Sequence, residues 1–339
     1  MRARSEVELG GCRVLDGGLA TELERRGVSL AGPLWSARAL RDAPQAVMAV
    51  HRDYLEAGAD CLMTASYQVS ALGYQEALAG EADEEEPGWQ ADPEAAVEAS
   101  VPAPFDCAPE EASRAALQAS VRLALVARRQ YREAGHTRPI VVAASLGPYG
   151  AALHNGAEFH GNYGIGFAEL VQFHRERIAV LAGTEADLLA FETVPSLEEA
   201  QAIAAALRDF PDLAAWISFT CRDPQLVAHG EPLAACAAAL EAVDQVVAVG
   251  VNCTAPSLIT GLLAELGQST QKPIVVYPNS GEEWDPAARR WTGRSDVAGY
   301  GAMAAEWFAA GAQMVGGCCR TGPAHIRAVR AAVGQLTPA

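Results

Sequence analysis

A repeated alternation of short apolar runs with longer amphipathic stretches is the feature that most constrains the fold of this chain. The apolar runs have the length and composition of strands, and they occupy residues 13–15, 61–63, 140–144, 188–191, 215–219, 248–251, 274–277 and 314–316. The Ala-rich stretches between and after them indicate helices at residues 44–57, 112–134, 166–182, 196–208, 233–243, 257–266, 297–310 and 324–333. Eight strands that alternate with eight helices predict an α/β fold, a (β/α)8 TIM barrel of parallel strands.

A doubly wound open sheet is the main alternative for such an alternation. That fold usually carries a Gly-rich GxGxxG turn after its first strand. Here the run at 13–15 leads into Asp16-Gly17-Gly18-Leu19, which lacks this spacing. The barrel therefore remains the prediction, with residues 1–339 forming a single domain.

One segment departs from the alternating pattern. Residues 80–111 are acidic, rich in proline and without helical periodicity, as in the stretch Glu84-Glu85-Glu86-Pro87. We expect an exposed insertion before the second helix, with the composition of a disordered segment.

The charge of the chain limits its partners. Its formal net charge is −17 and its sequence pI is about 4.8. Such a chain repels nucleic acid and anionic membrane surfaces, whereas it attracts a cationic small molecule. The N-terminal residues are polar and no uncharged stretch is long enough for a membrane helix, so neither a secretory signal nor a membrane span is expected. We therefore expect a cytoplasmic protein whose eight cysteines are thiols or metal ligands rather than disulfides.

Three cysteines fall where a barrel carries its chemistry, on the loops at the C-terminal ends of the strands. Cys253 follows the sixth predicted strand, and Cys318 and Cys319 follow the eighth. Closure of the barrel places these two strands two positions apart, so the three thiols can converge on one point. Zinc accepts thiolates in tetrahedral geometry and, in catalytic sites, keeps one position open. The pattern therefore indicates a Zn2+ site with these three cysteines as ligands.

Two other interpretations of these cysteines remain open. The sequence lacks the CxxC spacing of common zinc sites, and a single buried cysteine is usually a small apolar side chain. The adjacent pair Cys318-Cys319 could also form a redox-active disulfide, although such bonds are rare in the cytosol. Position alone does not decide among these interpretations.

Two carboxylates also lie at predicted strand ends, Asp16 after the first strand and Glu192 after the fourth. A polar side chain in such a position is costly unless it is used or paired. Both could bind the ammonium group of an amino acid, or both could cap the helices that follow. The strand-end residues Tyr67, Asn252 and Asn279 are further candidates to line a substrate pocket.

Together these segments resemble the homocysteine S-methyltransferase family. The similarity runs over nearly the whole chain, from Leu15-Asp16-Gly17-Gly18 to Cys318-Cys319-Arg320-Thr321. Gly250-Val251-Asn252-Cys253 and Gly316-Gly317-Cys318-Cys319 look like the family's zinc-ligand motifs, and Phe191-Glu192-Thr193 looks like its amino-acid-binding strand end. The segments at 145–150 and 276–282, SLGPYG and VYPNSGE, are most similar to the branch that uses S-methylmethionine or S-adenosylmethionine as methyl donor.

The resemblance implies a set of substrate contacts around the zinc ligands. Asp16 and Glu192 would hold the homocysteine amino group, and Gly17 and Thr64 would offer backbone contacts to its amino-acid end. For the sulfonium donor, aromatic faces and distant carboxylates are suitable partners, and the candidates are Tyr67, Trp284, Glu282 and Glu283.

The expected reaction is zinc-dependent transfer of a methyl group from the sulfonium to the homocysteine thiol, which forms methionine. Zinc would deprotonate the thiol, because the thiolate is the nucleophile and a thiol is mostly protonated at neutral pH. A betaine-dependent homocysteine methyltransferase and a non-catalytic protein that binds zinc and homocysteine remain alternatives. The betaine-dependent branch carries additional C-terminal length, and from its absence here we expect a monomer.

Overall fold

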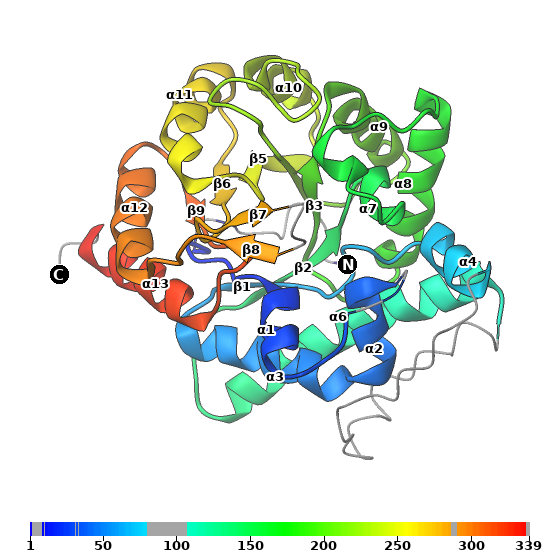
Figure 1. The fold of residues 1–339 in the computed structure, drawn as a ribbon, viewed down its shortest axis with the longest axis horizontal. Helices are drawn as coiled ribbons and strands as arrows, with labels where there is room; N and C mark the ends of the chain where they lie inside the picture. Colours follow the sequence, from blue (N-terminus) through cyan, green and yellow to red (C-terminus); the bar gives the residue numbers. More distant parts are fainter. Residues whose placement is uncertain are drawn as a thin grey trace.

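A curled parallel sheet of seven strands occupies the middle of the molecule, and helices surround it (Figure 1). The computed structural model describes residues 1, 9, 11–30, 32, 34–79, 107–285 and 290–336. The strands, in their order across the sheet, are β1 (Cys61–Met63), β2 (Val141–Leu146), β3 (Leu188–Val194), β4 (Ala215–Phe219), β5 (Val246–Asn252), β6 (Ile274–Tyr277) and β9 (Met314–Val315). Seven of the eight predicted strands therefore lie in one parallel sheet, in sequence order.

The first predicted strand, at residues 13–15, is the one missing from this sheet, and two isolated parallel bridges replace it. Val14 pairs with Val315 of β9, and Leu15 pairs with Cys61 of β1. The Leu15 N–H donates to the Val315 carbonyl (2.9 Å), and the Asp16 N–H donates to the Cys61 carbonyl (3.1 Å). The segment is too short to form a regular strand, yet it hydrogen-bonds to both edge strands of the sheet.

The helices include all eight that the sequence predicts, together with several short ones. The longer helices are α3 (Pro44–Ala57), α4 (Ala71–Ala79), α6 (Pro109–Glu133), α8 (Phe167–Ala182), α9 (Leu197–Leu207), α10 (Leu233–Leu240), α11 (Ile259–Ser269), α12 (Val297–Ala309) and α13 (Pro323–Leu336). The short ones are α1 (Leu19–Arg25), η2 (Trp35–Arg38), α2 (Ala39–Asp42), α7 (Tyr149–Ala152), η4 (Ala157–Phe159) and η5 (Pro256–Leu258). A hairpin that the sequence did not predict pairs β7 (Glu283–Asp285) with β8 (Arg290–Thr292).

The predicted insertion at 80–111 lies mostly outside the described residues, which resume at Cys107. Its last residues are helical, because α6 begins at Pro109, a residue whose fixed φ suits the first turn of a helix. No helix in the described part of the chain is long and apolar enough to cross a membrane.

Side chains of each strand alternate between two apolar clusters. Leu189 and Phe191 of β3 belong to the cluster that packs against the helices, whereas Leu188 and Ala190 belong to a smaller cluster enclosed by the sheet. Because successive residues of a strand face opposite sides, Glu192 continues the inner series. The same period of two places Asn252 of β5 in line with Ala248 on the inner side.

Three strands, β2, β3 and β5, continue past their predicted ends, and the differences in β3 and β5 concern the site. β3 extends to Val194 and β5 extends to Asn252, so Glu192 and Asn252 are strand residues rather than the loop residues that the sequence predicted. The register between β3 and β4 shifts between Phe191 and Val194, which marks an irregularity at this strand end. Both side chains therefore project from strands at the C-terminal end of the sheet, and Glu192 lies at the irregular end of β3.

Candidate active site

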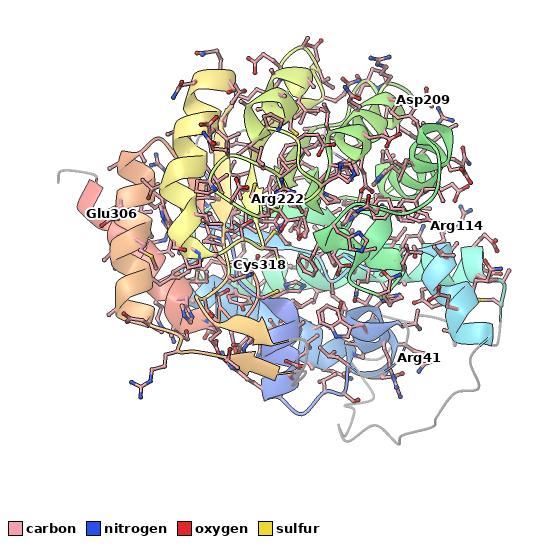
Figure 2. The ribbon with its side chains drawn as sticks, turned by 45° about the horizontal axis from the view of Figure 1, so that its top comes forward. Arg41, Arg114, Asp209, Arg222, Glu306 and Cys318 are labelled. Atoms are coloured by element: carbon pink, nitrogen blue, oxygen red, sulfur yellow. The ribbon has the colours of Figure 1, made fainter. Side chains whose placement is uncertain are left out.

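The three cysteines predicted to bind a metal lie together at the C-terminal end of the sheet. The Sγ atoms of Cys253, Cys318 and Cys319 are all within 4.8 Å of one another, and those of Cys253 and Cys319 are 3.6 Å apart. Cys318 lies over the middle of the strands, inside the ring of helices (Figure 2). All three side chains are partly exposed. Three sulfurs that converge in this way can hold one metal ion and leave a further position for a substrate.

The backbone around the cysteines is shaped to bring the sulfurs together. Cys253 follows β5 and has a φ of +48°, in the left-handed region that a residue with a Cβ seldom adopts. Its N–H donates to the Tyr277 carbonyl (3.3 Å), and the Cys318 N–H donates to the Pro278 carbonyl (2.8 Å). Just before Cys318, a Cβ on Gly316 would lie 2.5 Å from the Cβ of Leu15, so only glycine allows this approach.

Asn252 and Asn279, predicted to line the substrate pocket, hydrogen-bond to the segments that carry the cysteines and to the strands beside them. The Asn252 Oδ1 accepts hydrogen bonds from the Thr193 N–H (2.7 Å) and the Ser218 hydroxyl (2.8 Å), and its Nδ2 donates to Thr193 Oγ1 (2.8 Å). The same Nδ2 lies 4.0 Å from the Cys318 Sγ. The Asn279 Oδ1 accepts from the Cys319 N–H (3.2 Å). Both amide side chains therefore hydrogen-bond within the protein and help to fix the segments that carry the cysteines.

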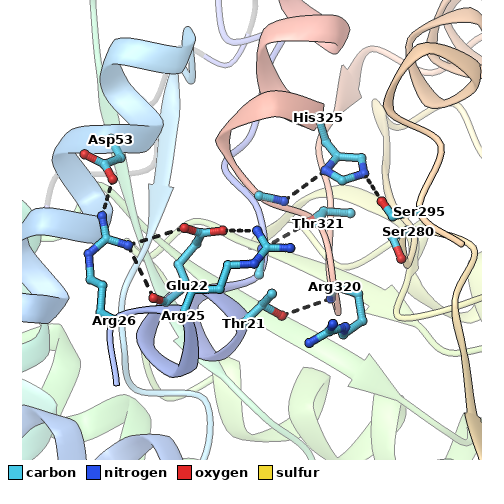
Figure 3. Close-up of polar contacts among 12 residues, drawn as sticks. Thr21, Glu22, Arg25, Arg26, Asp53, Ser280, Ser295, Arg320, Thr321 and His325 are labelled. Carbon is cyan, nitrogen blue, oxygen red and sulfur yellow. Dashed lines mark hydrogen bonds and ion pairs between the residues drawn. The ribbon is translucent and has the colours of Figure 1, made fainter. Parts of the chain in front are cut away.

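A second set of polar contacts fixes the loop after β9. The Arg320 N–H donates to Thr21 Oγ1 (3.0 Å), and the Gly322 N–H donates to His325 Nδ1 (3.1 Å), as Figure 3 shows. The other ring nitrogen of His325 lies 2.6 Å from the Ser295 hydroxyl. These bonds tie Cys318 and Cys319 to α1 and α13, so the two sulfurs are held from both flanking helices.

Asp16 and Glu192 both face the cysteine cluster and are almost fully buried. Asp16 Oδ2 accepts from the Met63 N–H (2.9 Å), whereas Asp16 Oδ1 and Glu192 Oε1 have no hydrogen-bond partner in the described part of the chain. Burial and the nearby Cys318 sulfur raise the pKa of both carboxyls well above the usual range. Neither residue caps a helix: Gly18 precedes α1, and the Ser196 hydroxyl caps α9. The pair of enclosed carboxylates can accept a cation such as an ammonium group.

The other predicted substrate contacts lie around this pair. Gly17 is buried next to Asp16 and packs against the Tyr54 hydroxyl. The Thr64 N–H donates to the Ala143 carbonyl (3.0 Å), so a backbone contact from Thr64 to a substrate would come from its carbonyl. Tyr67 lies on the side of Cys253, and burial raises its pKa well above the usual value.

Of the three donor candidates after β6, the structure describes the side chain of Glu282. Glu282 accepts a hydrogen bond from the Ser280 hydroxyl (3.0 Å) and pairs with Arg320 (3.4 Å between Oε2 and Nε), so its charge is already neutralised within the protein. The side chains of Glu283 and Trp284 lie outside the described part of the chain.

The chain matches proteins of known family over nearly its whole length. A family model described as homocysteine S-methyltransferase matches residues 13–333. The chain belongs to the homocysteine S-methyltransferase family. A family member from Bacillus subtilis (strain 168), homocysteine S-methyltransferase YbgG, is 42% identical over 322 residues, which cover 94% of this chain and 93% of that protein. A selenocysteine Se-methyltransferase from Brassica oleracea var. italica is 41% identical and covers 95% of this chain and 89% of its own.

A solved structure of the family has the same fold as this chain. The metallated form of the homocysteine methyltransferase MmuM from Escherichia coli superposes with a TM-score of 0.77 at 39% identity, over 95% of this chain and 96% of that one. The family resemblance noted in the sequence is thus confirmed by a family model, by relatives and by a structure.

Several residues of this family member's site gave no clear signal in the sequence. Thr193 has a φ of +60°, and its N–H and hydroxyl both bond Asn252. The Tyr277 hydroxyl lies 2.5 Å from the Ser218 hydroxyl, and it also accepts a hydrogen bond from the Trp216 indole N–H (3.1 Å). These residues brace the strand ends that carry the cysteines and Glu192. Single positions of this kind become recognisable only when the strands are placed side by side.

Proposed function

We propose that this protein catalyses zinc-dependent transfer of a methyl group from a sulfonium donor, S-methylmethionine or S-adenosylmethionine, to the thiol of homocysteine, which forms methionine. The observation that carries the proposal is the three-cysteine cluster beside two enclosed carboxylates, each with an oxygen that finds no partner among the described residues. A small molecule that carries both a thiol and an ammonium group matches this arrangement, because its sulfur would reach the metal site and its ammonium group would reach the carboxylates.

Zinc fits the donor set. Four sulfurs at about 2.3 Å from a tetrahedral zinc ion are separated from one another by about 3.8 Å. The Cys253 and Cys319 sulfurs are 3.6 Å apart, close to that separation, and the three sulfurs together stay within 4.8 Å. Cys253, Cys318 and Cys319 would hold the ion, with its remaining position for the substrate sulfur. When bound, zinc would supply the positive charge that keeps a substrate thiol deprotonated near neutral pH.

The residues of the chain would position the two reactants. Asp16 and Glu192 bind the homocysteine ammonium, which directs its sulfur toward Cys318 and away from water. In the transfer, a bond forms between the homocysteine sulfur and the methyl carbon while the bond from that carbon to the donor sulfur breaks. The electron pair of the broken bond returns to the donor sulfur, and the thiol proton leaves to solvent. Holding both reactants in line supplies much of the rate enhancement, because the reaction between the two bound molecules is then effectively unimolecular.

The architecture we infer for this function is one closed (β/α)8 barrel domain. The bridges from residues 14 and 15 to both edge strands support closure, since they join β9 to β1. Activity with betaine in place of a sulfonium, or binding without transfer, are the competing possibilities.

A donor panel tests the proposal. Zinc-loaded, reduced protein is incubated with homocysteine and, in turn, with S-methylmethionine, S-adenosylmethionine or betaine, and methionine formation is measured. We expect methionine with at least one sulfonium and none after treatment with a chelator, with activity restored by zinc. Turnover with betaine alone would replace the sulfonium assignment, and no turnover with any donor on zinc-loaded protein would exclude transfer.

Glu192→Gln is expected to weaken homocysteine binding without loss of metal. The amide keeps the size of the side chain but removes the negative charge that faces the ammonium group, and a buried charge pair that loses one partner costs roughly 2–5 kcal/mol. The dissociation constant for homocysteine, measured by calorimetry, should rise at least about 30-fold. Zinc content should stay at the wild-type level, and unchanged homocysteine affinity would remove Glu192 from the amino-group site.

A further inference from the structure

Glu158 is a carboxylate near the cysteine cluster that neither the predicted site nor the proposed function uses. It lies in η4, which packs on α7 and on β3, the strand that carries Glu192. Its side chain is mostly buried, and its Oε2 is enclosed without a hydrogen-bond partner among the residues that the structure describes. An enclosed carboxylate oxygen without a partner is costly unless a ligand satisfies it.

Glu158 and Tyr67 belong to neighbouring parts of the structure. The Tyr67 carbonyl accepts a hydrogen bond from the Gly147 N–H (2.9 Å), just before α7, and α7 packs on η4, which carries Glu158. In agreement with this arrangement, the charge of Glu158 and the Cys253 sulfur add to the effect of burial in raising the pKa of Tyr67. Glu158 and the ring of Tyr67 therefore lie in the same part of the site.

The loop that carries Glu158 is held in a fixed position. Glu199 accepts hydrogen bonds from the Tyr149 N–H (2.6 Å) and from the Tyr163 hydroxyl (2.7 Å), on the two sides of η4 in the sequence. In addition, a Cβ on Gly150 would lie 2.3 Å from the Glu158 backbone nitrogen, so α7 and η4 are in close contact. A carboxylate on such a braced loop is preorganised for a ligand, because little conformational entropy is lost on binding.

We propose that Glu158, together with the ring of Tyr67, binds the positively charged methyl donor and thereby selects net-cationic sulfonium donors over zwitterionic betaine. This inference rests on the proposed function, since it assigns the second reactant of that reaction. A carboxylate attracts the sulfonium and ammonium groups of such a donor, and an aromatic face attracts a sulfonium. The methyl-transfer step removes the sulfonium charge, so the demethylated product is held less tightly and can leave.

Binding of S-methylmethionine to zinc-loaded protein, measured by calorimetry without homocysteine, tests the assignment directly. Glu158→Gln should weaken this binding about tenfold or more, and Glu158→Asp should recover part of the loss. In turnover assays the KM for S-methylmethionine should rise by a similar factor without a fall in kcat, because the donor loses positive charge during the transfer and Glu158 therefore holds it at least as tightly in the ground state as in the transition state. Zinc content and homocysteine affinity should stay at wild-type values. Glu185→Gln, an exposed carboxylate before the opposite end of β3, is the matched control and should change none of these quantities.

The outcomes separate this inference from the proposed function. Equal S-methylmethionine affinity in Glu158→Gln and wild type, or a parallel loss of zinc and homocysteine binding, would overturn the donor role of Glu158. Wild-type protein that binds neither S-methylmethionine nor S-adenosylmethionine would overturn it as well. Protein that binds S-methylmethionine through Glu158 but forms no methionine from homocysteine would support the donor site and exclude the transfer reaction.

Discussion

Cys318→Ala is expected to remove both the metal and the activity. Cys318 supplies one of three sulfurs that lie within 4.8 Å of one another. Its sulfur also contributes to the raised pKa of both Asp16 and Glu192. Loss of an outer-shell partner of a metal ligand already lowers metal affinity by about 10–100-fold, so loss of a ligand should exceed that. We expect zinc content after dialysis below about one tenth of the wild-type level and methionine formation below detection, with metal measured by atomic absorption.

Cys107→Ser is the matched control for this variant. Cys107 is partly exposed, as Cys318 is, but it is not part of the cluster. It should keep zinc and activity at wild-type levels. A Cys318→Ala protein that retains stoichiometric zinc and normal turnover would show that the three sulfurs do not form the metal site.

The strand pattern was predictable because it depends on local sequence. Apolar runs of strand length between amphipathic helices identified all seven strands of the sheet within a few residues. The ends were predicted less well: β3 and β5 continue through Glu192 and Asn252, because strand pairing within the sheet extends past the last apolar residue of each run. The bridges at residues 14 and 15 depend on pairing with strands far apart in the sequence, which no local pattern encodes.

The cysteines and carboxylates were predictable from one topological rule, that chemistry gathers at the C-terminal strand ends of a barrel. That rule also nominated Asn252 and Asn279 as substrate contacts, and the structure adds that both amides hydrogen-bond other parts of the protein. The spacing of residues along the sequence predicts where a side chain lies in the fold, but it does not predict which groups its polar atoms hydrogen-bond. The same rule did not point to Glu158, because this residue does not follow a strand. It lies in η4, in a loop that Glu199 holds by hydrogen bonds.

Glu199→Ala is expected to destabilise the protein strongly and to weaken donor binding with it. Glu199 is fully buried on α9 and bonds the Tyr149 N–H, the Tyr163 hydroxyl and His174 Nε2 (3.0 Å). Because Arg177 can only donate to His174 Nδ1 (3.0 Å), the His174 Nε2 carries the proton that Glu199 accepts. Alanine would leave these donors without an acceptor and the Arg177 charge without compensation. Removal of one partner from a buried charged network costs about 3–5 kcal/mol, a large part of the roughly 5–15 kcal/mol that stabilises a folded domain.

Thermal and urea unfolding, followed by circular dichroism on the zinc-loaded protein, measure the effect. Glu198→Ala is the control on the same helix turn, where an exposed carboxylate is removed and the lost interaction with the helix dipole costs about 0.3–1 kcal/mol. Folded Glu199→Ala protein should also bind S-methylmethionine more weakly than wild type, because the loop that carries Glu158 loses two of its anchors while the cysteine loops keep theirs. If Glu199→Ala unfolds at the same temperature and urea concentration as Glu198→Ala, the network does not stabilise the fold, and the fixed position of Glu158 needs another cause.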